Sequence, residues 1–381
     1  MENTNFLQDA LPWLIPVIII AAIWDTVWKM IALWKSARNN HLAWFICIGI
    51  FNTIGILPIV YILMQKKKTN ILLVLLLFTP LIRASVQCDT TIIETEITLQ
   101  TKNGEIFGTL TTPKKFENIP AALIIAGSGP TDRDGNNPMM KNNSLKILAL
   151  ELSQNGIATL RYDKRGVGES KSAIKRETDL RFDDYVNDAS EWITLLKQDK
   201  RFSKVIVIGH SEGSLIGMIA STNADKFISI AGAGRSADKI IKEQLSTQPK
   251  EVQDLSFPII DSFKNEKLVD NVNPMLYSLF RPSIQPYMIS WFKYDPQHEI
   301  QKLSIPIMII QGTNDIQISV EDAKNLSKAN PKAELVIIDK MNHIFRIVEE
   351  DKQANIDTYN NVSLPIADEL INKIKNFILN H

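Results

Sequence analysis

The pentapeptide Gly209-His210-Ser211-Glu212-Gly213 places a serine between two glycines, directly after the β-branched run 205–208. A serine at a sharp turn between a strand and a helix adopts an unfavourable backbone conformation, and glycines on both sides let the two elements approach closely. The pattern favours Ser211 as a nucleophile. The sharp turn around it, with Gly209 and Gly213, is then a nucleophile elbow. The alternative is an ordinary tight turn, because this spacing also arises by chance.

A serine nucleophile requires a histidine base and an acid that orients the base. Of the five histidines, His343 has the most suitable setting, because it lies in a loop after a short apolar run. His298 precedes its strand and is predicted to be a surface or lid residue. Asp315, which follows a strand-like run and a glycine turn, is the predicted acid, and Asp339 is the reserve candidate.

Acyl-transfer chemistry also requires backbone N–H donors where negative charge develops on the carbonyl oxygen. We expect one oxyanion-hole donor to be the amide of Glu212, immediately after the nucleophile. The other is predicted to be the amide of Ser128, with Gly129 as the next candidate, in the loop after the apolar run 122–126. A phosphate-binding loop is the alternative, but Pro130 removes an amide where a phosphate cradle would need one.

Residues 90–381 resemble the α/β-hydrolase superfamily, with the chain order serine, acid, histidine that this superfamily uses. The segments 127–136 and 161–170 are similar to segments of bacterial carboxylesterases and serine-aminopeptidase-like hydrolases. The resemblance implies hydrolysis of small or medium acyl esters through an acyl-enzyme intermediate. It does not imply a particular substrate, and the substrate-binding residues stay unknown.

The coarse pattern predicts an α/β fold with a mostly parallel sheet, flanking helices and a leading antiparallel hairpin. Strand-like runs lie at 94–100, 105–111, 121–126, 157–162, 205–209, 227–231, 306–310 and 335–338. Helical stretches lie at 144–155, 183–197, 212–222, 320–329 and 364–379. The long interval at about 235–304 is predicted to be a helical cap, because one crossover helix needs far fewer residues.

Charged residues gather in the two segments that carry the resemblance. Asp132, Arg133 and Asp134 could orient a substrate, but bracing of the oxyanion loop is the favoured interpretation. A salt-bridged structural turn is favoured for Lys164 and Arg165.

Residues 1–63 are predicted to form a two-helix membrane anchor. The stretches 11–24 and 42–63 are strongly apolar, and five of the seven tryptophans fall within the first 44 residues, as is typical near a bilayer interface. Between them, Trp24, Trp28 and Trp34 recur at helical spacing and suggest a segment along the membrane surface. The pattern resembles the amino-terminal module of cardiolipin synthases and phospholipase D-like proteins, which would supply an anchor and no active site.

Residues 64–88 resemble a signal peptide that lies inside the chain. Three lysines at 66–68 precede the apolar run 71–78, so the segment is interpreted as a third span, a cleavage site or a trace of two former reading frames. Each interpretation places the hydrolase domain, residues 89–381, on the extracytoplasmic side of a membrane. The lysines and arginine of the first loop weaken this orientation.

Composition excludes several function classes. The 42 basic and 42 acidic residues balance, so there is no electrostatic argument for nucleic acid as a partner. The two cysteines indicate no disulfide framework. We predict no metal and no cofactor, because no ligand cluster at usable spacing is visible. The oligomeric state is not determined by the sequence.

Three functions are consistent with these observations. The favoured one is a serine hydrolase that cleaves small-molecule carboxylic esters with a Ser211, Asp315 and His343 triad. The second is the same fold acting as a peptidase, acyltransferase or thioesterase. The third is a non-catalytic hydrolase-like binding protein of the envelope.

Overall fold

The computed structural model describes residues 24–39, 41–42, 44–45, 48, 58–59, 61–62 and 92–380. The chain divides into two compact units, Met1–Gln87 and Cys88–His381.

In the first unit, a helix runs over 24–38, which agrees with the helical spacing of its tryptophans. The rings of Trp24 and Trp28 meet edge to face with centroids 5.6 Å apart. None of the helices in the described part of the chain combines the length and apolarity needed to cross a bilayer. Most of the expected spans at 11–24 and 42–63, and the whole of 64–88, lie outside the described residues.

The second unit is built on an eight-stranded sheet within residues 92–380. The strands are β1 (Ile92–Thr101), β2 (Gly104–Pro113), β3 (Ile119–Ile125), β4 (Ala158–Tyr162), β5 (Phe202–His210), β6 (Lys226–Ile230), β7 (Ile307–Gly312) and β8 (Glu334–Ile338). Their spatial order is β1-β2-β4-β3-β5-β6-β7-β8. The pairs β1/β2 and β2/β4 are antiparallel and the other neighbours are parallel, so the predicted mostly parallel sheet with a leading hairpin is confirmed.

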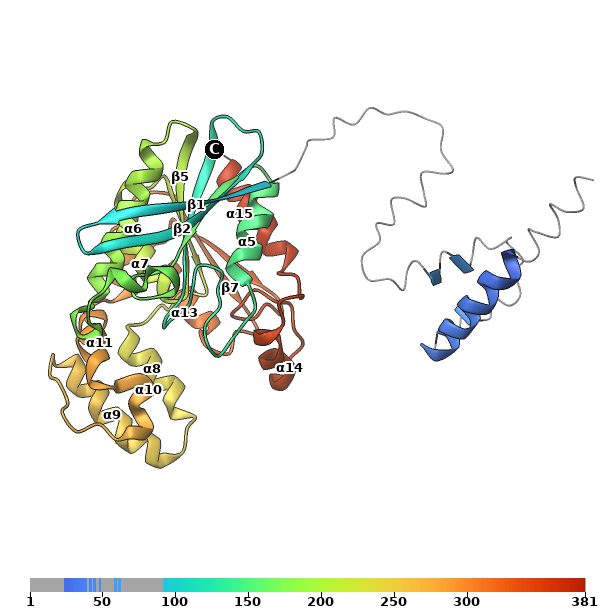
Figure 1. Ribbon diagram of the computed structural model, residues 1–381. Coiled ribbons are helices and arrows are strands. Elements are labelled where there is room, and N and C mark those ends of the chain that lie inside the picture. The colour runs from blue at the N-terminus through green and yellow to red at the C-terminus, as the bar shows by residue number, and fades with distance from the viewer. Residues whose placement is uncertain are drawn as a thin grey trace, which may run out of the picture. The chain divides into compact units, whose positions relative to one another are not determined.

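Helices cover both faces of the sheet (Figure 1). The main-domain helices are α5 (Ser144–Gln154), α6 (Phe182–Gln198), α7 (Glu212–Ala220), α13 (Val320–Ala329), α14 (Lys352–Asp357) and α15 (Asp368–Leu379). Alternate residues of β3 enter different cores: Leu123 joins the core with α6 and α7, while Ile124 joins the core with α5 and α15. Because both faces of β3 are covered in this way, its sequence is a continuous apolar run over 119–125.

Helix α15 begins later than expected, at Asp368 and not at 364. Pro365 disfavours a helical conformation at the residue before it. The amide of Ala367 also donates to the carbonyl of Phe345, which holds the chain in a non-helical path up to the helix start.

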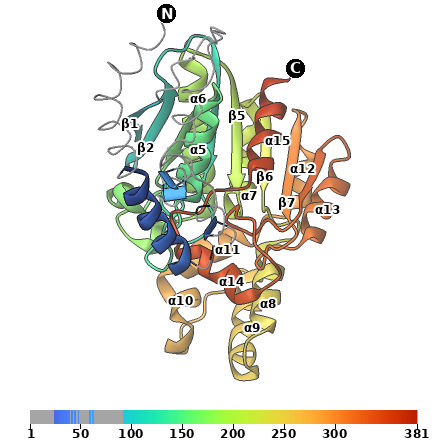
Figure 2. The ribbon, with the colours of Figure 1, turned by 90° about the vertical axis from the view of Figure 1, so that its right-hand side faces the viewer.

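The interval between β6 and β7 forms the expected helical cap. Its helices are α8 (Ala237–Ser246), α9 (Lys250–Lys264), α10 (Tyr277–Phe280), α11 (Gln285–Trp291) and α12 (Pro296–Gln301). Helices α8 to α11 gather at one end of the sheet, as Figure 2 shows. Phe182 of α6 stacks on Trp291 with centroids 6.1 Å apart, and its amide donates to Ser290 Oγ at 2.8 Å, so α11 is fixed against the main domain.

Candidate active site

Ser211 lies at the sharp turn between β5 and α7. Its φ of 55° and ψ of −119° are a strained combination for a residue with a side chain. Its amide donates to the carbonyl of Ile230 on the neighbouring strand β6, which helps to hold the turn. Although Ser211 is the N-cap residue of α7, its side chain makes no capping hydrogen bond, so the hydroxyl is not committed to the helix.

The two glycines of the elbow allow close backbone approach. A Cβ on Gly209 would lie 2.3 Å from the carbonyl oxygen of Gly213. A Cβ on Gly213 would lie 2.3 Å from the carbonyl oxygen of Ile125 in β3. Both distances are far below ordinary contact, so α7 can pack against β5 and β3 only if these positions lack side chains.

We expect Gly213→Ala to lower the free energy of unfolding by about 3 kcal/mol, because the added methyl group meets rigid backbone that only a shift of strand or helix can relieve. Urea denaturation of the full chain measures the loss. Gly156→Ala is the control: its Cβ meets nothing within 4 Å, and only the φ of +80° adds strain, about 1 kcal/mol. Equal losses in both variants would contradict the role of close approach at Gly213.

Asp315 and His343 are brought together by the ends of two neighbouring strands. Asp315 follows β7, His343 follows β8, and Asp315 Oδ2 lies 2.8 Å from His343 Nδ1. The other carboxylate oxygen accepts the amides of Gln317 and Ile318 at 2.8 and 3.0 Å. Burial by itself raises the pKa of Asp315, but His343 and these amides outweigh burial and leave the pKa below its ordinary value. The carboxylate therefore stays ionised and fixes His343 with Nδ1 protonated.

The alternative candidates lie elsewhere. Asp339 is exposed and accepts a hydrogen bond from Thr313 Oγ1 at 3.2 Å. His298 lies exposed on α12. Of the two predicted acids, Asp315 is the one that contacts His343.

His210 is a site residue whose role the sequence did not indicate. Its ring centroid lies 4.8 Å from that of His343, and its Nε2 lies 2.9 Å from the His343 carbonyl oxygen. Burial lowers the pKa of His210 to about 3, so the ring is neutral. Since a carbonyl can only accept, Nε2 carries the proton and donates it to this hydrogen bond. The residue before Ser211 thus holds the loop that carries His343 beside the elbow.

Ser128 and Glu212, whose amides are the predicted oxyanion donors, both line a cavity with Ser211. Glu212 is the first residue of α7, where backbone amides have no partner within the helix and the helix dipole favours negative charge. Ser128 follows β3, and a Cβ on the neighbouring Gly127 would lie 3.2 Å from Ser211 Cβ. Ser128 and Gly129 line the same cavity as Ser211 and Glu212.

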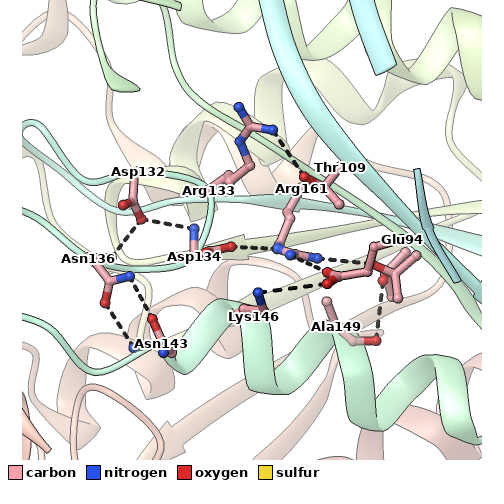
Figure 3. A network of polar contacts seen from close by, with 12 residues as sticks. Glu94, Thr109, Asp132, Arg133, Asp134, Asn136, Asn143, Lys146, Ala149 and Arg161 are labelled. Atoms are coloured by element: carbon pink, nitrogen blue, oxygen red, sulfur yellow. Dashed lines mark hydrogen bonds and ion pairs between the residues drawn. The ribbon is translucent and has the colours of Figure 1, made fainter. Parts of the chain in front are cut away.

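The loop after β3 is braced by charged side chains (Figure 3). Arg161 donates from Nε to Asp134 Oδ1 at 2.8 Å and from Nη2 to Glu94 Oε1 at 2.5 Å. Asp132 Oδ1 accepts the amides of Asp134 and Asn136 at 2.9 and 2.8 Å, which closes the turn. These contacts agree with bracing.

Arg133 anchors the loop to the segment 161–170. Its Nη2 lies 3.0 Å from Asp163 Oδ2 and also bonds Glu169, and its amide donates to Asp163 Oδ1 at 2.8 Å. Arg133 therefore joins the two segments that carry the hydrolase resemblance, 127–136 and 161–170, and holds the loop that contains Ser128.

A cavity of about 300 Å³ opens over Ser211. Its walls come from the cap and from the edges of the main domain, and most of the side chains are apolar. The larger apolar lining residues are Leu215, Ile240, Ile241, Leu279, Ile284, Met288, Trp291 and Ile318. Among the described residues, no group of three or more histidine, cysteine or acidic side chains could hold a metal ion.

Comparison with known folds decides the architecture. The structure of Est1E from Butyrivibrio proteoclasticus with bound ferulic acid superposes with a TM-score of 0.52 at 16% sequence identity, covering 75% of this chain and 100% of Est1E. Residues 92–380 have the α/β-hydrolase fold. Within this α/β-hydrolase domain, residues 142–278 match the family described as serine aminopeptidase, S33.

The α/β-hydrolase domain also has a curated relative, Esterase EstD from Thermotoga maritima. The two are 28% identical over 264 residues, which is 66% of this chain and 60% of the relative. The chain thus matches less than two thirds of the length of that esterase. Residues 3–72 match a family of unknown function, DUF5652, so the expected likeness to the cardiolipin synthase module gains no support.

Proposed function

We propose that this protein is a serine hydrolase that cleaves small-molecule carboxylic esters. The proposal rests on one arrangement: an ionised Asp315 holds His343, whose ring lies 4.8 Å from that of His210, and the next residue is the strained Ser211, which lines an apolar cavity. The similarity to an esterase supports it.

In the proposed reaction, Ser211 Oγ attacks the ester carbonyl carbon and passes its proton to His343 Nε2. The carbonyl oxygen becomes an oxyanion that accepts hydrogen bonds from the amides of Ser128 and Glu212. Collapse of this intermediate expels the alcohol, which takes the proton from His343 and leaves an acyl group on Ser211. Water, deprotonated by His343, then attacks the acyl carbonyl carbon, and His343 returns the proton to Ser211 Oγ as the carboxylic acid leaves.

The composition of the cavity favours an ester over a peptide with a free amino terminus. Among its described lining residues, Glu212 is the one acid, and its carboxylate is buried and paired with Lys164. The lining also holds Arg235 and Arg281, which are paired with Asp322 and Glu177. Among these lining residues a free ammonium group would find no acid that is not already paired, which favours an ester over a substrate with a free amino terminus.

A purely binding role is the third candidate, and the strained serine argues against it. A φ of 55° at Ser211 is a cost that a binding pocket does not require.

We expect the full chain to hydrolyse p-nitrophenyl esters, with acyl length limited by the walls of the cavity. Ile241 of α8 lines this cavity, so Ile241→Trp is predicted to lower kcat/KM for the octanoate at least about tenfold relative to the acetate. Ile241→Ala is the matched variant and is predicted to shift the preference toward longer chains. No turnover of any ester by the folded chain would reject the proposed function, and an unchanged length preference in both variants would reject this cavity as the acyl site.

We also propose that residues 1–88 attach the protein to a membrane and that the hydrolase domain is extracytoplasmic. The lysines at 66–68 before an apolar run support this orientation. Protease added to intact spheroplasts should digest residues 89–381. Protection of these residues while an external marker is digested would overturn the proposal.

A further inference from the structure

Lys164 and Glu212 form a buried ion pair next to the candidate oxyanion hole, and the proposed reaction does not use this pair. Lys164 Nζ lies 2.8 Å from Glu212 Oε2, and the two side chains are 1% and 2% exposed. Lys164 Nζ also donates to the carbonyl oxygen of Gly127 at 2.5 Å, and it lies 4.9 Å from the ring centroid of Tyr185. The ammonium group therefore has three partners.

The carbonyl of Gly127 belongs to the same peptide unit as the amide of Ser128. A trans peptide is planar, and its C=O and N–H bonds point in opposite directions. When Lys164 holds the Gly127 oxygen, it also fixes the direction of the Ser128 N–H, which points away from Lys164. Ser128 lines the cavity together with Ser211.

The charge on Lys164 adds a second effect. A hydrogen bond to a carbonyl oxygen polarises the peptide unit and strengthens its N–H as a donor. An ammonium donor is charged, so its bond to Gly127 is stronger than a bond between neutral groups. The Ser128 amide is thus both oriented and strengthened from behind.

Glu212 connects the two oxyanion donors. Its own amide is one candidate donor, and its carboxylate holds the lysine that fixes the other. Its second oxygen accepts a hydrogen bond from the hydroxyl of Tyr287 on cap helix α11. Burial, together with the negative charge of Glu212, raises the pKa of Tyr287 well above its ordinary value, so the phenol stays protonated and remains the donor.

We propose that Lys164 and Glu212 are positioning residues that preorganise the oxyanion hole by fixing the peptide unit Gly127–Ser128. This inference rests on the proposed esterase function and deepens it. It predicts a defect in stabilisation of the tetrahedral intermediate while the ester ground state still binds normally.

The test compares two double variants of the full chain. Lys164→Met with Glu212→Gln removes the ion pair without leaving a buried charge alone. Arg165→Met with Asp188→Asn is the matched control, because Arg165 and Asp188 also form a buried pair, with Nη2 and Oδ1 2.5 Å apart. Arg165 bonds the Ala173 carbonyl and not the oxyanion loop.

The readouts are kcat and KM for a p-nitrophenyl ester and the inhibition constant of an alkyl trifluoromethyl ketone. Ser211 Oγ adds to the ketone carbon, its proton passes to His343, and the carbonyl oxygen becomes an oxyanion in a stable hemiketal. For the Lys164/Glu212 variant we expect kcat to fall about 10- to 100-fold and the inhibition constant to rise by a similar factor, with KM changed less than about threefold. The control variant should lose thermal stability and keep all three constants.

The inference is overturned if kcat and the inhibition constant of the Lys164/Glu212 variant stay within twofold of the wild-type values. A defect confined to KM would overturn it as well. If that variant does not fold, Glu212→Asp withdraws the carboxylate from Lys164 at constant charge and should show the same pattern at about fivefold or more. Failure of the proposed function looks different, because the wild type and Ser211→Ala would then be equally inactive toward esters.

Discussion

Ser211→Ala is expected to reduce kcat for p-nitrophenyl esters by about 10⁴- to 10⁶-fold. The oxygen that would form the acyl bond is removed, and only the oxyanion donors and the binding pocket remain. Alanine also takes a φ of 55°, so the strain at the elbow is nearly the same in both proteins. The unfolding free energy should therefore change little, and steady-state kinetics of the folded variant report chemistry alone.

The neighbouring serine Ser128 supplies a control for this experiment. The proposed reaction uses its amide and not its hydroxyl, so Ser128→Ala should keep kcat within about threefold. Ester hydrolysis that survives Ser211→Ala and is lost in Ser128→Ala would show that the elbow serine is not the nucleophile.

Asp315→Asn is expected to lower kcat about 10³- to 10⁴-fold with little change in KM. The carboxylate accepts from His343 Nδ1 at 2.8 Å, whereas an asparagine that turns its NH₂ group toward the ring favours the tautomer that cannot accept a proton from Ser211. The measurement is kcat across pH 5 to 9.

Because the folded-state pKa of Asp315 lies below its ordinary value, its carboxylate stabilises the fold at neutral pH. This stabilisation of the fold is lost as the pH falls from about 4 through the lowered pKa of Asp315.

Asp339→Asn is the matched control, since Asp339 also lies on this edge of the sheet but is exposed and bonds Thr313. Its kcat should stay within about twofold of wild type. A large loss in Asp339→Asn with none in Asp315→Asn would reverse the assignment of the acid.

The sequence was sufficient to predict the sheet because its signals are local. The central strand β5 contains the β-branched run 205–208, and glycines stand two residues before and two residues after Ser211. The order of Ser211, Asp315 and His343 after the strands β5, β7 and β8 was also readable, because side chains that follow parallel strands meet at one edge. Their catalytic roles remain predictions.

What could not be predicted depends on contacts between distant segments. Lys164 and Arg165 are adjacent basic residues that look equivalent, yet they pair with Glu212 and Asp188, 48 and 23 residues away. The cap shows the same difficulty: Leu279 lines the cavity, whereas its neighbour Phe280 is fully buried against Phe263. Which face of a short helix turns inward is decided by packing and not by residue type.

The cap leaves the main domain after β6, and the chain returns close to the same point, because Gln297 Nε2 donates to the carbonyl oxygen of Gly234 at 2.8 Å. Its two ends therefore converge, and the segment can be exchanged as a cassette without disturbing the strands that present Ser211, Asp315 and His343. Relatives with this scaffold could diversify in substrate range by replacing the cassette alone. Tyr287 sets one condition on such exchange: a transplanted cap without a hydroxyl at this position would supply a new pocket but leave one Glu212 oxygen without its partner.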